Sequence, residues 1–258
     1  MVIDSHAHIK YPKEGRIGSD DWSLDLAYVE AADILGIDVL VCSCLTPKPA
    51  TPEIFRIGNN RVLQAMKRWP GRIWMHTYVN PGYSREAIAE LERTHAIEDV
   101  VGVKLYDDYT CSSPVVYPVI EKCIELGAPV VINQGRITDR LFRKPHYVSD
   151  AGDIAELARR YPEAKLIADH IGGGGDWEWT VKTLAEVPNV YHEIGGSVCD
   201  EGMMEMALEY LGADRLLLAL DCSLCAGMGK FRALPCGEEE RKKIAGENFL
   251  RLCGRLQE

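Results

Sequence analysis

Eight short apolar runs alternate with eight longer amphipathic stretches along the 258 residues of this chain. The apolar runs are nearly continuous and rich in β-branched residues, which is typical of parallel strands buried on both faces. The predicted strands are Val2–Ser5, Asp38–Cys44, Ile73–Val79, Val100–Tyr106, Pro129–Asn133, Lys165–Asp169, Asn189–Ile194 and Arg215–Leu220. The predicted helices are Leu24–Leu35, Glu53–Trp69, Ser84–His95, Val115–Leu126, Asp150–Tyr161, Trp177–Val187, Glu201–Leu211 and Glu238–Cys253. This alternation predicts an α/β fold, a single (β/α)8 TIM barrel, with an open doubly wound sheet as the alternative.

No linker, repeat or low-complexity tract interrupts the alternation, so we expect one domain over residues 1–258. The longest irregular segments, residues 9–23 and 46–52, follow the first two predicted strands. In a barrel of this kind the active site lies at the carboxyl ends of the strands. These two segments are therefore expected to form loops around the mouth of the site.

The overall composition narrows the classes of partner. The net charge is −10, which disfavours nucleic acid and anionic membranes, and no apolar run is long enough to cross a bilayer. The nine cysteines and the N-terminus without a basic and then apolar segment favour a reducing cytoplasm. Cys222 and Cys225 have zinc-like spacing, but no second pair exists, so we expect free thiols near the barrel rim. The expected partner is a small-molecule substrate, and the sequence leaves a homo-oligomer open.

Two histidines near the N-terminus indicate a metal site. Strand side chains alternate between faces, so we expect Asp4, His6 and His8 to point the same way. Asp221 ends the last predicted strand, which neighbours the first strand in a closed barrel. His6, His8 and Asp221 therefore predict a catalytic metal site with an open position for water. The alternative for Asp221 is a helix N-cap.

His170 is the second candidate for chemistry. It ends the sixth predicted strand and is followed by the glycines 172–175, which permit close approach of a substrate to the backbone. We expect His170 to act as a general acid or base, as a metal ligand, or as both in turn, with a structural loop histidine as the alternative. His192 and Glu193 point to opposite faces, and the sequence leaves open which of them faces the barrel interior. The other histidines are expected to be structural: His76, His95 and His146.

Several segments, taken in their order along the whole chain, resemble the amidohydrolase superfamily and within it the amidohydrolase-2 branch, which includes enzymes similar to aminocarboxymuconate-semialdehyde decarboxylase. The segments that carry the resemblance are 2–8 (VIDSHAH), 71–81 (GRIWMHTYVNP), 101–105 (VGVKL), 168–173 (ADHIGG), 189–193 (NVYHE), 215–221 (RLLLALD) and 244–254 (IAGENFLRLCG).

The resemblance implies one divalent metal ion, usually zinc. The family holds it with a His-x-His pair, a fifth-strand histidine and an eighth-strand aspartate, while a sixth-strand histidine assists proton transfer. Here those roles fall on His6, His8, Asp221 and His170, and we count His170 among the metal ligands as well. Asn133 stands where the fifth-strand histidine is expected. An amide oxygen is a weaker zinc ligand than imidazole, so manganese or another divalent ion is an alternative.

The remaining polar strand-end residues are candidates for substrate binding: Lys104, Tyr106, Asn133 and Arg136. In other branches of the superfamily a fourth-strand lysine is carboxylated and bridges two metals, which is an alternative for Lys104. The sequence thus predicts a metal-dependent hydrolase of a small substrate that can carry a carboxylate group, with His170 and Asp221 as the catalytic residues. The alternatives are a non-oxidative decarboxylase on the same scaffold and a barrel that binds a ligand without catalysis.

Overall fold

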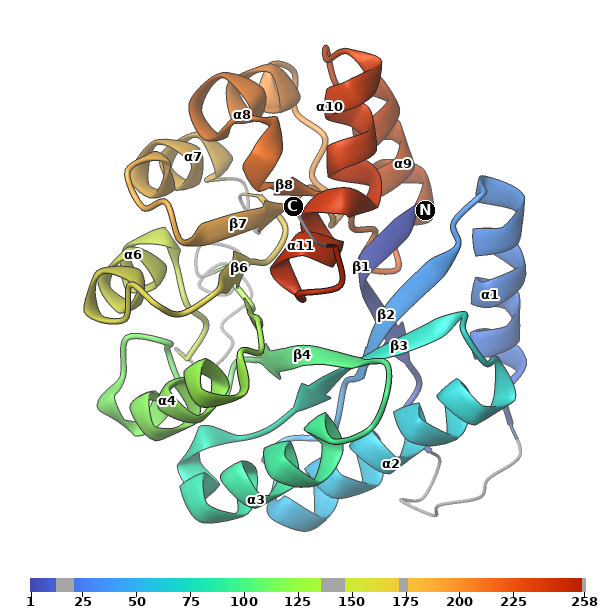
Figure 1. Cartoon of the computed structure of the whole chain (residues 1–258), viewed down its shortest axis with the longest axis vertical. Coiled ribbons are helices and arrows are strands. Elements are labelled where there is room, and N and C mark those ends of the chain that lie inside the picture. Colours follow the sequence, from blue (N-terminus) through green and yellow to red (C-terminus); the bar gives the residue numbers. More distant parts are fainter. Residues whose placement is uncertain (13–20, 136–146, 172–175, 257–258) are drawn as a thin grey trace.

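The computed structural model describes residues 1–12, 21–135, 147–171 and 176–256. Within these residues, parallel strands form one sheet in the order β1 to β8 (Figure 1). The strands are β1 (Ile3–Ile9), β2 (Val39–Cys44), β3 (Ile73–Tyr78), β4 (Val100–Leu105), β5 (Val130–Ile132), β6 (Leu166–Ala168), β7 (Val190–Glu193) and β8 (Leu216–Leu217). Backbone hydrogen bonds from Ser5 N to Leu218 O and from Asp221 N to His6 O, both 2.9 Å, join the first strand to the segment after the last. The predicted TIM barrel is confirmed, because an open doubly wound sheet would not bring its first and last strands together.

Helices surround this sheet (Figure 1). Their bounds are α1 (Ser23–Leu35), α2 (Pro52–Arg68), α3 (Ser84–His95), α4 (Tyr117–Leu126), α6 (Ala151–Arg160), α7 (Trp177–Ala185), α8 (Met203–Leu211), α9 (Leu224–Ala233), α10 (Glu238–Lys242) and α11 (Asn248–Leu252). The local sequence explains several ends: Asp150 and Asp153 form a capping box at the start of α6, and Gly36 ends α1 with φ +74°. None of the helices in the described part of the chain is both long and apolar enough to cross a membrane.

Two helices differ from the sequence prediction. Helix α9 was not expected, because Gly227 and Gly229 interrupt its apolar pattern and it starts only a few residues after the last strand. The predicted closing helix divides into α10, a π-helical turn over Lys243–Glu247, and α11. Within that turn the Ile244 carbonyl accepts a hydrogen bond from Leu218 N at 2.9 Å, which ties the closing helices to the eighth strand.

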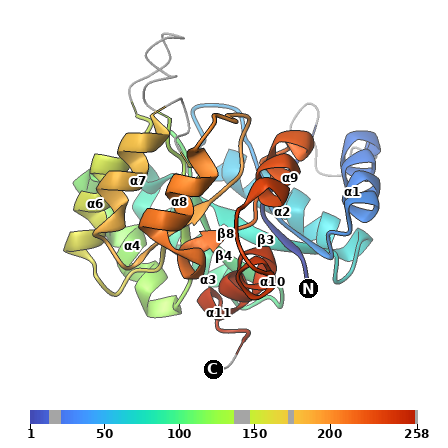
Figure 2. The ribbon, with the colours of Figure 1, turned by 90° about the horizontal axis from the view of Figure 1, so that it is seen from above.

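The barrel interior is apolar at its N-terminal half and polar at its C-terminal half. The apolar layer consists of Ile3, Val39, Val41, Trp74, Val101, Val131, Ile167 and Leu217, closed from below by Phe249 and Leu252 of α11. Figure 2 shows α11 and the C-terminus at this end of the barrel. Because strand side chains alternate, the residues two positions after an inward apolar residue also face the interior on most strands, and several of these are polar. On β1 and β4 an extra residue shifts this alternation by one position. This alternation places the functional side chains at the carboxyl ends of the strands.

A bulge in β1 corrects one sequence expectation. Asp4 pairs with Leu40 and Ala7 with Cys42, so three steps on β1 oppose two on β2. The extra residue reverses the alternation between Asp4 and His6. Asp4 therefore faces outward, where its carboxylate accepts a hydrogen bond from Tyr28 Oη of α1 at 2.9 Å. The expectation that Asp4 shares a face with His6 and His8 is wrong, although the two histidines do lie together.

Candidate metal centre

His6, His8 and Asp221 converge at the carboxyl ends of the first and last strands. The Nε2 atoms of His6 and His8 lie 3.1 Å apart, and Asp221 Oδ1 lies 3.1 Å from His8 Nε2 and 3.6 Å from His6 Nε2. Donor atoms around a tetrahedral ion with bonds of about 2.0–2.1 Å lie about 3.3 Å apart. The three donors therefore have the mutual spacing of atoms that share one ion.

A turn after Leu220 aims Asp221 at the two histidines. Asp221 and Cys222 both adopt positive φ, at 47° and 56°. Such conformations cost about 1–3 kcal/mol each in non-glycine residues and persist only where the surroundings enforce them. The N-cap of α9 is Ser223 rather than Asp221, so the alternative role of Asp221 as a helix cap is wrong.

Each imidazole is oriented by a partner on its other nitrogen. His8 Nδ1 lies 3.2 Å from Ser43 Oγ on β2. His6 Nδ1 lies 2.7 Å from Asp169 Oδ1 and 2.9 Å from Glu193 Oε2. Such partners fix the ring orientation and tautomer of metal-binding histidines. Both rings therefore present Nε2 to the same point.

Glu193 settles the question that the sequence left open for the seventh strand. Its carboxylate faces the interior, where it contacts both His6 and Ser5. His192 points the other way and is fully buried, and among the described residues its ring nitrogens have no hydrogen-bond partner. Burial lowers the pKa of His192 to about 3, so this ring is a neutral core residue.

Asp169 and Glu193 are the residues that sequence reasoning did not assign to the site. Asp169 is fully buried and forms an ion pair with Lys104 in addition to its contact with His6. Both carboxylates could have been predicted from the alternation of inward and outward side chains along their strands. Asp169 lies two positions after the inward residue Ile167, and Glu193 lies two positions after Tyr191, which packs against the same apolar layer.

Lys104 and Tyr106 lie at the edge of the centre. Lys104 is 1 % exposed, and its Nζ lies 3.1 Å from His6 Nε2 while it is paired with Asp169. The Tyr106 ring centroid lies 6.0 Å from Lys104 Nζ and 5.0 Å from Lys48 Nζ. Burial raises the pKa of Tyr106, so its hydroxyl stays protonated. These two residues form the wall of the centre on the side of β4.

The fifth strand carries the other substrate-binding candidates. Asn133 follows β5 and lies two positions after the inward residue Val131, so alternation directs its side chain toward the barrel axis. It is partly buried, and its N–H donates to Leu105 O at 3.0 Å. Arg136 and the glycines 172–175 lie outside the described residues.

The charges of the centre depend on burial and on the carboxylates. Burial alone would lower the pKa of His6, but attraction to Asp169 and Glu193 outweighs it and raises the pKa to about 10. Burial lowers the pKa of His8 to about 4. For Asp221, the hydrogen bond from His8 and the charge of His6 outweigh burial and lower the pKa to about 2. At neutral pH, His8 and Asp221 are therefore ready to bind a metal ion, whereas His6 must first lose a proton.

His170 lies beside the three donors but outside their close set. Its Nε2 is 3.5 Å from Asp169 Oδ1 and 3.8 Å from Asp221 Oδ2, and its ring stacks over His6 with centroids 6.1 Å apart. Its φ of 22° is unusual for a non-glycine residue. This position suits a group that exchanges protons with the centre better than one that holds the ion.

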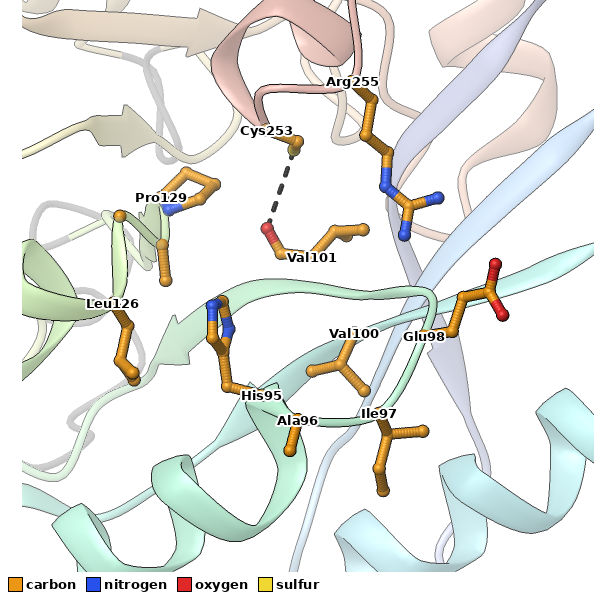
Figure 3. A pocket seen from close by; sticks show the side chains of 12 residues that line it. His95, Ala96, Ile97, Glu98, Val100, Val101, Leu126, Pro129, Cys253 and Arg255 are labelled. Carbon is orange, nitrogen blue, oxygen red and sulfur yellow. Dashed lines mark hydrogen bonds between the residues drawn. The ribbon is translucent and has the colours of Figure 1, made fainter.

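A cavity at the other end of the barrel is separate from this centre. It has a volume of about 400 Å³ and lies where β4 and β5 begin, with His95, Cys253 and Arg255 among its lining residues (Figure 3). The Cys253 thiol there donates to Val101 O at 3.6 Å. Active sites of these barrels lie at the opposite face, so we assign this cavity no catalytic role. Cys222 and Cys225 are both exposed and are not joined by a disulfide.

Comparisons with known proteins identify the family and the fold of this chain. A family model described as amidohydrolase matches residues 3–255. No curated protein matches the chain. Among solved structures, a dihydroxybenzoic acid decarboxylase from a Polaromonas species, with bound manganese and the inhibitor 2-nitroresorcinol, has a TM-score of 0.74 at 18% identity, covering 98% of this chain and 96% of that chain.

Two further solved structures show the same fold. The 5-carboxyvanillate decarboxylase from Sphingomonas paucimobilis has a TM-score of 0.72 at 16% identity, covering 98% of both chains. The 4-oxalomesaconate hydratase from Rhodopseudomonas palustris has a TM-score of 0.74 at 16% identity, covering 99% of this chain and 96% of that chain. At these identities the likeness demonstrates a shared barrel and leaves the reaction to be argued from the site.

Proposed function

This chain belongs to the amidohydrolase family, and from that membership we propose that it is a metal-dependent hydrolase of a small substrate. The observation that carries the proposal is the convergence of His6 Nε2, His8 Nε2 and Asp221 Oδ1 within 3.1–3.6 Å of one another. Two imidazoles and one carboxylate are a common donor set for catalytic metals, and they leave coordination positions open.

The residues fit a divalent ion. Both Nδ1 atoms are occupied by protein partners, so the Nε2 atoms are the ones left for the ion. The nitrogen donors favour zinc, while the carboxylate and the amide of Asn133 also suit manganese. When bound, such an ion supplies Lewis acidity, which polarises a carbonyl group and lowers the pKa of water toward neutrality.

The chain's own residues would move the protons. His170 Nε2 and Asp221 Oδ2 lie 3.8 Å apart beside the donor set, which supports a pair that takes a proton from water and returns it to the leaving group. Lys104 faces the same space and its charge is balanced by the ion pair with Asp169, so we assign it a role in orienting the substrate. Tyr106 and Asn133 would line the substrate space, with Arg136 as a further candidate.

Non-oxidative decarboxylation is the second candidate, favoured by the solved structures of decarboxylases with this fold. In that reaction the centre would hold the carboxylate group of the substrate. His170 or Asp221 would then deliver a proton to the carbon that loses carbon dioxide. The same residues serve both reactions, so the products must distinguish them.

The test begins with protein purified without chelators and analysed for metal content. The metal is then removed, and zinc or manganese is added back. Each form is assayed with small amides, lactones and aromatic carboxylates, and mass spectrometry shows whether water is added or carbon dioxide is lost. We expect one ion per chain and turnover that depends on it, both lost in His8→Ala. Absence of metal uptake would overturn the proposed centre. Full metal occupancy without turnover would favour the third alternative, a barrel that binds a ligand without catalysis.

A further inference from the structure

Lys230 of α9 is a buried cation that the proposed chemistry does not use. The side chain is 5 % exposed, and its Nζ donates to the carbonyl of Gly195 and, at 2.9 Å, to that of Gly196. Among the described residues, no carboxylate lies within ion-pair distance of this ammonium group. Burial lowers its pKa to about 8, as expected for a charge taken out of water. Burying an ammonium group without a carboxylate partner lowers the stability of the folded protein. The two hydrogen bonds that Lys230 makes to one loop therefore suggest a role for these contacts.

The loop that Lys230 holds follows β7 and passes directly against His170. A Cβ added to Gly196 would lie 2.9 Å from His170 Cβ and 3.3 Å from its Cγ, and Gly196 has a φ of +73°. A Cβ added to Gly195 would lie 3.2 Å from Ala219 Cβ. The backbone of Gly195 and Gly196 therefore packs directly against two neighbours. Gly195 contacts Ala219, after the eighth strand, and Gly196 contacts His170.

Polar contacts orient only one edge of the His170 ring, through the Nε2 contacts with Asp169 and Asp221. Its backbone is held, since Gln134 Nε2 donates to His170 O at 3.3 Å and Ile171 N donates to Glu193 O at 2.9 Å. Its Nδ1, however, is buried and has no hydrogen-bond partner among the described residues. Packing against Gly196 therefore acts together with the Nε2 contacts to set the direction of the ring.

We propose that Lys230 is a positioning residue for His170. By fixing the carbonyls of Gly195 and Gly196, it keeps the loop against the imidazole and so holds His170 Nε2 at 3.5 Å from Asp169 and 3.8 Å from Asp221. This inference rests on the proposed function to the extent that His170 transfers protons. The placement of the ring itself can be tested without turnover.

The chain provides a matched control for the test. Lys165 Nζ also donates to two backbone carbonyls, those of Gly127 at 3.3 Å and Leu252 at 2.9 Å. These contacts lie at the N-terminal end of the barrel, near α11. Lys165→Met therefore removes the same kind of interaction as Lys230→Met, but far from the centre.

The experiment compares these two variants by NMR of the histidine ring protons. The His170 signals are assigned as those that disappear in His170→Asn. The values of kcat and KM and the metal content are measured for each variant. We expect Lys230→Met to shift the His170 signals and to lower kcat by roughly 10- to 100-fold, because small misplacement of a catalytic group has effects of that size. Its metal content and KM should remain close to those of the wild type. Lys165→Met should change only thermal stability.

Gly196→Ala should shift the same His170 signals with Lys230 intact, since it alters the contact directly. If Lys230→Met does not fold, Lys230→Gln takes its place. Its side chain is shorter and neutral but keeps an amide group that can donate to the carbonyls, so it should give a smaller shift. Unchanged His170 signals in a folded Lys230 variant would overturn the inference, whether or not a substrate is known. A wild-type protein without metal-dependent turnover would instead count against the proposed function alone.

Discussion

Glu193 Oε2 lies 2.9 Å from His6 Nδ1, on the side of the imidazole ring opposite the Nε2 atom that faces His8 and Asp221. The two residues come from strands β7 and β1, which are far apart in the sequence. A carboxylate beside Nδ1 stabilises the proton on that nitrogen and so favours the tautomer whose Nε2 lone pair is free. The buried layer beneath the three donors therefore prepares the site for a cation.

Replacing Glu193 with glutamine should weaken metal binding by about 10- to 100-fold, the usual effect of losing a partner behind a metal-binding histidine. The amide oxygen carries no negative charge, so it attracts the His6 ring less strongly than the carboxylate does. Competition with a chelating dye measures the affinity, and thermal melts report the fold. Glu90→Gln is the matched control, because Glu90 is a buried carboxylate that pairs with Arg93 away from the centre. Equal affinity in Glu193→Gln and the wild type would contradict the assigned role.

Metal affinity should rise with pH. Burial alone would lower the pKa of His6, but Asp169 and Glu193 raise it to about 10, so the ring carries a proton that an incoming ion must displace. His8 and Asp221, with pKa values of about 4 and about 2, release none near neutrality. The apparent affinity for zinc should therefore increase about tenfold per pH unit from about pH 6 to pH 8.

Calorimetry in buffers with different ionisation enthalpies should show release of about one proton per bound ion. Binding without proton release across this range would mean that the His6 ring is neutral before the ion arrives.

His170→Asn should reduce turnover by roughly 100-fold or more, the scale expected for loss of a general acid or base. Metal content should largely survive, because His170 Nε2 lies 3.8 Å from Asp221 and outside the close donor set. Elemental analysis and steady-state kinetics check both parts. Near-normal turnover would remove the proton-transfer role, and loss of the metal would make His170 a ligand instead.

Asn133→His should increase zinc affinity without unfolding the protein. Asn133 lies two positions after the inward residue Val131, so an imidazole there would face the barrel axis and could add a nitrogen donor. The larger ring could strain the pocket by about 1–3 kcal/mol, which thermal melts would reveal. Dye competition measures the affinity. An unchanged affinity in a folded variant would show that position 133 does not reach the ion.

The sequence by itself determined the barrel and identified His6, His8 and Asp221 as candidate metal ligands. Eight apolar runs separated by helical patterns specify strands buried on both faces, and that pattern depends only on local side-chain chemistry. His6, His8 and Asp221 could be connected because the first and last strands of a closed barrel are neighbours. Which way each strand faces was harder to predict, since a single extra residue reverses the alternation, as the bulge between Asp4 and Ala7 shows.

Only the tertiary structure decided which residues surround His6 and His170. Asp169 and Glu193 meet His6 from strands far along the chain, and Lys104 is drawn into an ion pair with Asp169 rather than left free for a substrate. Lys230 reaches the loop beside His170 through a helix that the sequence pattern did not predict. Contacts of this kind depend on strand register and on packing across the whole barrel, which local periodicity does not encode.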